Sequence, residues 1–226
     1  MSPPVALRWK LLIVIGLAVL AVDQWTKFLA VKYLTPGIAM IHEEARPNMT
    51  AEERAPILEK LGLGEQLAAF YGSVRDPCRQ PSVRCPHVKV VDGFWNWRYV
   101  QNPGAAWGLL ATASERIRVP FFWVVSVAAI AFIIGFFRKL KDEQLLLVVS
   151  LSLVFGGAIG NFIDRLHLSY VIDFIDWYIG DRHWPTFNFA DAAITCGVVL
   201  LMLEWLVDTI RGSSAEPAEE PAKPAP

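Results

Sequence analysis

Two aspartates at the edges of apolar segments are the residues of this chain best suited to chemistry. Asp173 lies in the stretch VIDF (171–174), and Asp191 ends the stretch FNFAD (187–191). An ionised carboxylate at the edge of hydrocarbon is costly, so membrane proteins that keep several there generally use them in a proton relay, an ion path or a catalytic site. The pair therefore indicates a functional site, provided that the chain spans a membrane.

The composition and the hydropathy pattern place the chain in a membrane. Of its 226 residues 54% are hydrophobic, and the mean hydropathy is positive, whereas soluble domains have an apolar share of roughly 45 to 50%. Four apolar runs each approach the roughly 20 residues that cross a bilayer as a helix. These runs are residues 11–30, 119–137, 145–163 and 189–207. We therefore expect an all-α membrane protein with four transmembrane helices.

The first run has a basic start and an apolar centre, as a cleaved secretory signal does. No clear A-x-A site follows it, and it continues through Asp23 to Lys27. We interpret it as a retained first helix.

Basic residues predict the orientation of the four helices. Arg138, Lys139 and Lys141 crowd the short connection between the second and third runs, which is therefore expected in the cytoplasm. An even number of spans puts both termini on the cytoplasmic side as well. Residues 1–210 then form one transmembrane domain, and the Pro-, Ala- and Glu-rich segment 211–226 is predicted to be a disordered cytoplasmic tail. The net charge of −1 gives no indication of a nucleic-acid partner.

Counting along these helices at about 1.5 Å per residue brings four acidic residues to one depth near the outer leaflet. They are Asp23, Asp164, Asp173 and Asp191. Lys27 and Arg165 lie at the same depth as counter-charges. Asp23 and Lys27 are four residues apart on one helix face, as are Asn161 and Arg165. We expect a polar, water-accessible cleft there, because intramembrane charges face protein or water.

Several of these residues also have purely structural interpretations. Asp23 with Lys27 suits a pair that ties the bundle together as well as it suits a substrate contact. Asp164 with Arg165 could cap the third helix. We expect Asp176, Asp181 and His183 to be solvated loop residues.

The histidines do not indicate a zinc site. His42 and His87 lie beside Cys78 and Cys85 but lack tight metal-ligand spacing.

Taken alone, the carboxylates leave three functions open: an enzyme, a small proton-coupled transporter, or a structural membrane subunit. A transporter site is expected near the midplane between repeated halves, whereas these aspartates gather near one face and the chain has no internal repeat. A structural subunit leaves the costly polar cluster unexplained.

Five sequence blocks resemble the lipoprotein signal peptidases, the type II signal peptidases of bacteria. The blocks are DQWTK (23–27), NPGAAW (102–107), GNFIDR (160–165), VIDF (171–174) and FNFAD (187–191). The resemblance covers about residues 8–40 and 88–208. Trp107 stands where the family often has Phe, and residues 41–89 look like a periplasmic insertion.

The resemblance implies a fold and an activity. The fold is four transmembrane helices with a small periplasmic β-cradle at the membrane surface. The segment 90–100, rich in Val, Phe, Trp and Tyr, suits its strands, with Asp92-Gly93 as a turn. The activity is that of an aspartic endopeptidase with Asp173 and Asp191 as its catalytic dyad, needing no metal or other cofactor. The implied substrate is a prolipoprotein, cut just before a diacylglyceryl-modified cysteine in the bacterial inner membrane, near the periplasmic face. We expect membrane lipid as the other partner, and a monomer.

The resemblance also implies supporting residues around the dyad. Asn161, Arg165 and Asn188 are expected to orient it. Residues expected to line or brace the cleft are Asn102, Gly104, Asp23, Lys27 and Asp164.

The family offers no guide to the insertion at 41–89. Thr50 and Glu53 form a capping-box pattern, which predicts one or two short amphipathic helices, interrupted near Pro56 and at 62–64. They could lie on the outer membrane surface, cover the cleft, or form a solvent-exposed loop. Since every block lies outside the insertion, its replacement by a linker is expected to spare the chemistry.

The three cysteines are expected to differ in state. Cys78 and Cys85 share an outward-facing segment in which oxidation is permitted, so a disulfide is expected there. Cys196 is expected to stay a buried thiol.

Overall fold

The structure is a computed structural model that describes residues 6–46, 48–72, 78, 85, 87–104, 110 and 112–213, with side chains described as far as residue 210. Trp107 and most of the expected tail, residues 214–226, lie outside this described part.

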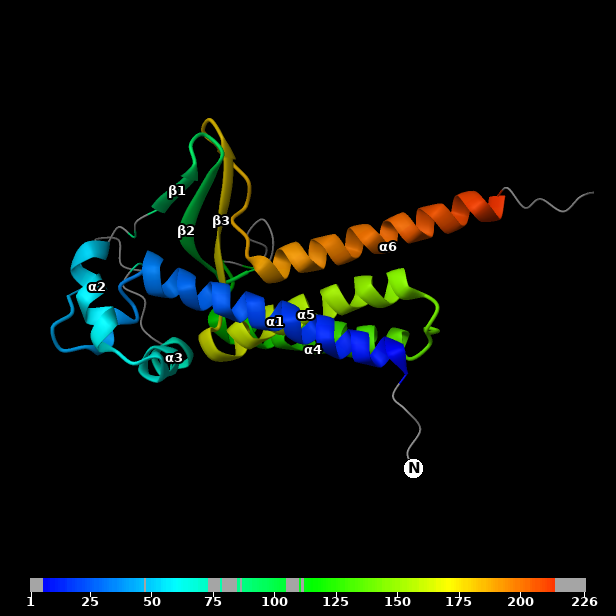
Figure 1. The fold of residues 1–226 in the computed structure, drawn as a ribbon, viewed down its shortest axis with the longest axis horizontal. Helices are drawn as coiled ribbons and strands as arrows, with labels where there is room; N and C mark the ends of the chain where they lie inside the picture. Colours follow the sequence, from blue (N-terminus) through cyan, green and yellow to red (C-terminus); the bar gives the residue numbers. More distant parts are fainter. Residues whose placement is uncertain are drawn as a thin grey trace, which may run out of the picture.

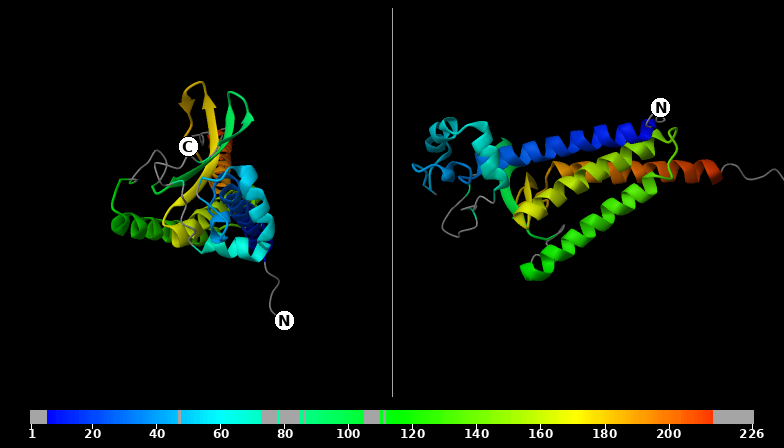
Figure 2. Two further views of the ribbon diagram at one scale, coloured as in Figure 1. Left: turned by 90° about the vertical axis from the view of Figure 1, so that its left-hand side faces the viewer. Right: turned by 90° about the horizontal axis from the view of Figure 1, so that it is seen from below.

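Four long helices form a bundle, as predicted. They are α1 (Leu7–Leu34), α4 (Glu115–Phe137), α5 (Leu145–Leu168) and α6 (Phe189–Ser213). Each is long and apolar enough to cross a membrane. Helix α5 packs against the other three, while the N-terminal end of α4 and the C-terminal end of α6 diverge from it (Figures 1 and 2). The start of α1 and the end of α6 lie at the same end of the bundle (Figure 1).

Glycines allow α5 to approach its neighbours closely. A Cβ on Gly157 would lie 2.5 Å from the carbonyl oxygen of Ala190 in α6, and one on Gly160 would overlap the carboxylate of Asp23 in α1. These two contacts bring α1 and the start of α6 onto one stretch of α5.

A small antiparallel sheet stands at the end of the bundle opposite the start of α1 (Figure 1). Its strands, in sheet order, are β1 (His87–Val91), β2 (Trp95–Asn102), β3 (Val171–Ile179) and β4 (Arg182–His183). The predicted turn at Asp92-Gly93 is confirmed, and Gly93 has the positive φ of 77° that glycine adopts readily. In the register of β2 against β3, Val100 lies opposite Asp173.

The insertion is helical and begins as its sequence predicts. It contains η1 (Ala39–Ile41), α2 (Ala51–Lys60) and α3 (Leu63–Tyr71). In the capping box of α2, the Thr50 Oγ1 accepts from the Glu53 amide (3.2 Å) and the Glu53 Oε2 accepts from the Thr50 amide (2.7 Å).

One of the two predicted helix breaks is confirmed. Gly62 is the N-cap of α3, but the break expected at Pro56 is wrong, because α2 continues through it. A proline removes a single helical hydrogen bond, here to the carbonyl of the exposed residue Glu52, which solvent can reach.

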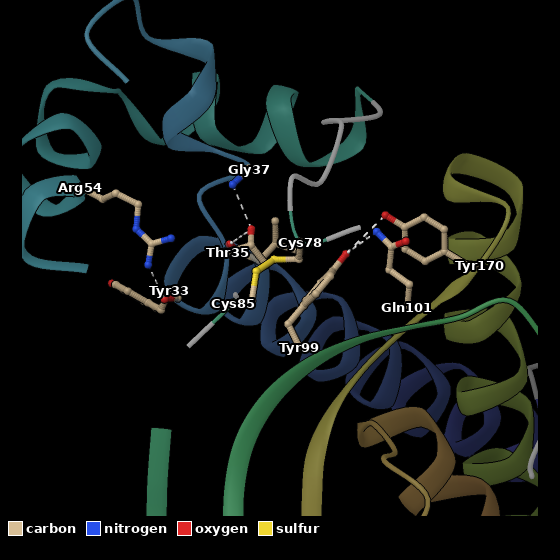
Figure 3. Close-up of a disulfide and its surroundings, with 10 residues drawn as sticks. Tyr33, Thr35, Gly37, Arg54, Cys78, Cys85, Tyr99, Gln101 and Tyr170 are labelled. Atoms are coloured by element: carbon tan, nitrogen blue, oxygen red, sulfur yellow. Dashed lines mark hydrogen bonds between the residues drawn. A yellow bond between two sulfur atoms is a disulfide. The ribbon is translucent and has the colours of Figure 1, made fainter. Parts of the chain in front are cut away.

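The insertion packs against the end of α1 and the sheet, so it is not a free loop. Its apolar side chains join one core with α1, β2 and β3. The members of that core that meet at this junction are Phe28, Ile38, Ile57, Leu58, Phe70, Tyr99, Ile172 and Phe174. Buried Arg54 donates from Nη2 to the carbonyl of Tyr33 at 3.2 Å. The expected disulfide between Cys78 and Cys85 is present and lies beside Thr35 and Tyr99 (Figure 3).

Cys196 departs from its expected environment. It is free, but it is exposed on the surface of α6. A span that packs along one face only presents its other residues to lipid, and an apolar run in the sequence does not distinguish the two faces.

Candidate active site

The chain returns from β3 to α6 in a way that brings Asp191 beside Asp173. Phe187 bridges to Ile175: its amide donates to the Ile175 carbonyl at 3.1 Å, and its carbonyl accepts from the Ile175 amide at 2.9 Å. Residues 188–191 therefore run next to the part of β3 that carries Asp173.

Asn188 connects the two aspartates directly. Its side-chain Oδ1 accepts from the backbone amide of Asp191 (3.0 Å), and its own backbone amide donates to Asp191 Oδ2 (3.2 Å). This reciprocal pattern caps the start of α6. The Nδ2 of Asn188 donates to Asp173 Oδ1 at 2.7 Å and to Asn161 Oδ1 at 3.2 Å. The side chain of Asn188 is fully buried. One helix cap thus fixes both carboxyl groups.

Two further asparagines donate to the carboxylate oxygens of Asp173 and Asp191 that Asn188 does not bind. Asn161 of α5 donates from Nδ2 to Asp191 Oδ1 at 2.8 Å. Asn102, at the end of β2, donates from Nδ2 to Asp173 Oδ2 at 2.9 Å, while its Oδ1 accepts from the amide of Gly104 at 3.1 Å. The bond from the Gly104 amide at the end of β2 therefore orients Asn102 toward the dyad.

The surroundings of Asp173 favour its protonated form. Burial, followed by the negative charge of Asp191, raises the pKa of Asp173 to about 7. The amide donors of Asn102 and Asn188 stabilise the ionised form, but they offset only part of this effect. Asp173 thus holds a proton to a much higher pH than an ordinary aspartate does.

A buried ion-pair cluster contacts the residues that hold the dyad. Lys27 Nζ lies 2.9 Å from Asp23 Oδ2, 2.9 Å from Asp164 Oδ2 and 3.1 Å from Asn161 Oδ1. Asp23, Lys27 and Asp164 are all buried. The alternative interpretation, in which Asp164 caps α5 together with Arg165, is not supported, because Asp164 faces Lys27.

Each carboxylate of this cluster binds the backbone just before one dyad residue. Asp164 Oδ2 accepts from the Ile172 amide at 3.0 Å, and Asp23 Oδ1 accepts from the Ala190 amide at 3.0 Å. Ile172 precedes Asp173, and Ala190 precedes Asp191. The ion-pair cluster therefore positions both halves of the dyad.

Sequence reasoning overlooked Gln24 as a member of this cluster. Its Nε2 donates to Asp164 Oδ1 (3.1 Å), to Asp23 Oδ2 (3.2 Å) and to the carbonyl of Gly160 (3.4 Å). A polar amide within an apolar span, next to Asp23, was the signal that could have identified it.

Arg165 is a counter-charge near the aspartates, as expected, since its charge interacts with those of Asp191, Asp164 and Asp173. In the described part of the chain it forms no salt bridge. Its guanidinium donates to the carbonyls of Asn161 and Gly104, each at 3.4 Å, and lies 4.9 Å from the ring centroid of Phe122. Arg165 thus joins α5 and α4 to the turn after β2, where Gly104 is placed.

Asp176 is not a solvated loop residue, in contrast to the expectation, whereas His183 is solvent-exposed as expected but lies in a strand. Asp176 is a buried residue of β3; its Oδ1 lies 2.7 Å from Nδ1 of His183 in β4, and its Oδ2 accepts from Asn96 at 3.3 Å. Pairing of the strands supplied these partners, and local sequence does not predict it. Across the described ranges, no three His, Cys, Asp or Glu side chains are placed to hold a metal ion.

Comparison with known proteins assigns this architecture to a family. The family described as "Signal peptidase (SPase) II" matches residues 73–207. A protein named "Lipoprotein signal peptidase" from Anaeromyxobacter sp. (strain Fw109-5) is 43% identical over 202 residues, which are 87% of this chain and 84% of the relative. The chain belongs to the signal peptidase II family. It is therefore a membrane protease.

Other relatives agree with this assignment. The lipoprotein signal peptidase of Geobacter metallireducens is 48% identical over 126 residues, covering 56% of this chain and 76% of the relative. A solved structure described as a bacterial membrane enzyme at 2.3 Å resolution has a TM-score of 0.58 and 27% identity, with 94% of both chains covered. The transporter alternative finds no support among these signal peptidase II relatives.

Proposed function

We propose that this signal peptidase II removes the signal peptide from diacylglyceryl-modified prolipoproteins by cutting just before the lipidated cysteine. The curated relatives carry the name lipoprotein signal peptidase. A site at the outer end of a four-helix bundle suits such a substrate, because its lipid would hold the scissile bond near the membrane surface.

Asp173 and Asp191 are the catalytic dyad of this proposal. The observation that carries it is the bridge by Asn188, which bonds Asp173 Oδ1 through its side chain and Asp191 Oδ2 through its backbone amide. Two carboxyl groups held this close share one proton more readily than they both ionise.

The raised pKa assigns the resting proton to Asp173. Asp191 takes a proton from water, whose oxygen attacks the scissile carbonyl carbon, while Asp173 donates its proton to the carbonyl oxygen. The resulting gem-diol collapses as its hydroxyl proton returns to Asp173 and the C–N bond breaks. Asp191 then passes its proton to the leaving nitrogen, which restores the starting state. No metal or other cofactor takes part.

The remaining residues of the site hold this arrangement in place. Asn161, Asn188 and Asn102 donate to the dyad. Asp23 and Asp164 bind the backbone amides next to it, and Lys27 pairs with both of these carboxylates. The carbonyl of Gly104 accepts a hydrogen bond from Arg165.

The site is proposed to face the periplasm, with both termini in the cytoplasm and the chain in the bacterial inner membrane. The basic connection at 138–141 supports this orientation. Residues 1–210 are proposed to act as one peptidase domain, with residues beyond it as a tail. One chain supplies every group of the site, so the enzyme is proposed to act as a monomer.

Cleavage of a defined precursor tests this function. Purified protein in detergent is incubated with a diacylglyceryl-modified precursor and, in parallel, with the same precursor lacking the lipid. Release of the signal peptide from the lipidated form, with a new N-terminus at the modified cysteine, is the expected result. Equal cleavage of both forms, or a cut elsewhere, contradicts the proposed specificity.

A further inference from the structure

The insertion reaches the ion-pair cluster through one side chain. Tyr71, the last residue of α3, donates its hydroxyl to Gln24 Oε1 at 3.3 Å. Gln24 has a defined orientation there, because its Nε2 faces three oxygen acceptors: the carboxylates of Asp23 and Asp164 and the carbonyl of Gly160. Its Oε1 must therefore face away from them, and Tyr71 is the donor that it meets.

Two successive hydrogen bonds connect Gln24 to the backbone next to each aspartate of the dyad. Its Nε2 binds Asp164, whose other oxygen accepts from the amide of Ile172, the residue before Asp173. It also binds Asp23, whose other oxygen accepts from the amide of Ala190, the residue before Asp191. A shift of the Gln24 amide would thus reach both aspartates.

Helix α3 is anchored by residues just before Tyr71, whose own side chain is 41% exposed. Phe70 packs edge-on against Phe28 of α1, with ring centroids 5.8 Å apart. Gln66 ties α3 to the end of α2 by donating to the carbonyls of Leu58 (2.9 Å) and Leu61 (2.8 Å). The ring of Tyr71 itself lies edge-on to His167 of α5, at 5.8 Å.

The Tyr71 phenol also stays protonated at neutral pH. Burial, followed by the charges of Asp164 and Asp23, raises its pKa. It is therefore a donor under the conditions in which the enzyme works.

We propose that Tyr71 is a positioning residue for the peptidase reaction, through which the insertion orients Gln24 and the ion-pair cluster behind the dyad. This inference rests on the proposed function for its assay, and it reverses the expectation that the insertion can be removed without effect on the chemistry. Asn161 and Lys27 belong to the same cluster, so the insertion becomes part of the structure that sets dyad geometry.

Tyr71→Phe tests the proposal, because it removes one oxygen and keeps the ring contacts with Phe70 and His167. Changes along a coupled network alter an equilibrium by roughly 2- to 30-fold; we expect kcat to fall within that range while KM stays within about twofold of wild type. Tyr33→Phe is the matched control, since Tyr33 is exposed and, within the described residues, its hydroxyl makes no hydrogen bond. Its kcat should equal that of wild type.

A purely structural role predicts another pattern, in which the melting temperature falls but kcat, measured well below it, does not change. An unchanged kcat in Tyr71→Phe overturns the proposal whatever the melting temperature. The double variant with Gln24→Met tests the route: the two losses in kcat should not add, and full additivity would show that Tyr71 does not act through Gln24. Failure of the wild type to cleave the lipidated precursor, by contrast, counts against the proposed function itself.

Discussion

Asp173 differs from Asp191 in its position and in its partners. It is enclosed between β2, β3 and the cap of α6, and burial raises its pKa to about 7. Asp191 lies in the first turn of α6, where Asn161 and the Asn188 amide donate to it. The unlike surroundings of the two carboxyl groups suit them to the separate roles of acid and base that we propose.

The pH profile of cleavage should therefore be bell-shaped, with its alkaline limb near neutrality. A raised pKa means that Asp173 is protonated below about pH 7 and loses its proton above it, which leaves a dyad with two negative charges and no acid. At low pH both carboxyl groups are protonated and the base is lost. The measurement is kcat/KM against pH.

Asn102→Ala should move the alkaline limb to higher pH. Asn102 donates to Asp173 Oδ2 and so stabilises the ionised form; without this donor the pKa of Asp173 rises further. Gln101→Ala, one position away on β2, is the comparison. A limb that moves to lower pH, or that stays in place, would contradict the assignment of the limb to Asp173.

Among the secondary-structure elements, α5 determines how closely the site can assemble. Gly157 and Gly160 let α1 and α6 approach it, and Asn161 and Asp164 follow in the next turn. The glycines are thus a packing requirement of the ion-pair cluster, and not merely a weakness in the helix.

Gly160→Ala should destabilise the protein by about 1–3 kcal/mol, the usual effect of overpacking, because its Cβ would overlap the Asp23 carboxylate. Thermal unfolding in detergent measures the change. Gly135→Ala in α4 is the control, since a Cβ there meets no atom within 4 Å. If both variants unfold alike, close packing at Gly160 is unimportant.

The sequence predicted the elements better than it predicted their contacts. The four spans followed from hydropathy, most of β1 and β2 from the β-branched and aromatic residues of segment 90–100, and the α2 cap from Thr50 and Glu53, whereas β3 and β4 were not predicted. The partners of Asp176 depend on how the strands pair, and the exposure of Cys196 depends on how α6 is rotated about its axis. Neither is encoded in a local sequence pattern. The Tyr71–Gln24 contact joins residues 47 positions apart, so only the folded chain could reveal it.

On the scale of the whole molecule, the insertion, the bundle and the sheet meet at one end. The disulfide between Cys78 and Cys85 lies at that junction, beside the end of α1 and β2 (Figure 3). A disulfide that closes such a short loop typically stabilises a fold by about 2 kcal/mol.

Thiol labelling checks this covalent arrangement. Denatured, non-reduced protein should show one reactive cysteine, Cys196, and three after reduction. Three reactive cysteines before reduction would exclude the disulfide.

The proposed mechanism also predicts that the whole enzyme works without a metal. A shared-proton dyad needs no ion, so cleavage should survive treatment with a chelator such as EDTA. A rate that is lost with the chelator and restored by zinc would refute the mechanism.

The dyad itself is tested most directly by cleavage of the lipidated precursor with Asp173→Asn and Asp191→Asn. Each change keeps the shape of the side chain and some of its hydrogen bonds but removes one titrating group of the pair. Asp164→Asn serves as the contrast, because its carboxylate pairs with Lys27 and holds the Ile172 amide, so that variant should lose thermal stability first. We predict that both dyad variants remain folded in detergent and release no signal peptide; substantial cleavage by both would contradict the assignment of Asp173 and Asp191 as the catalytic residues.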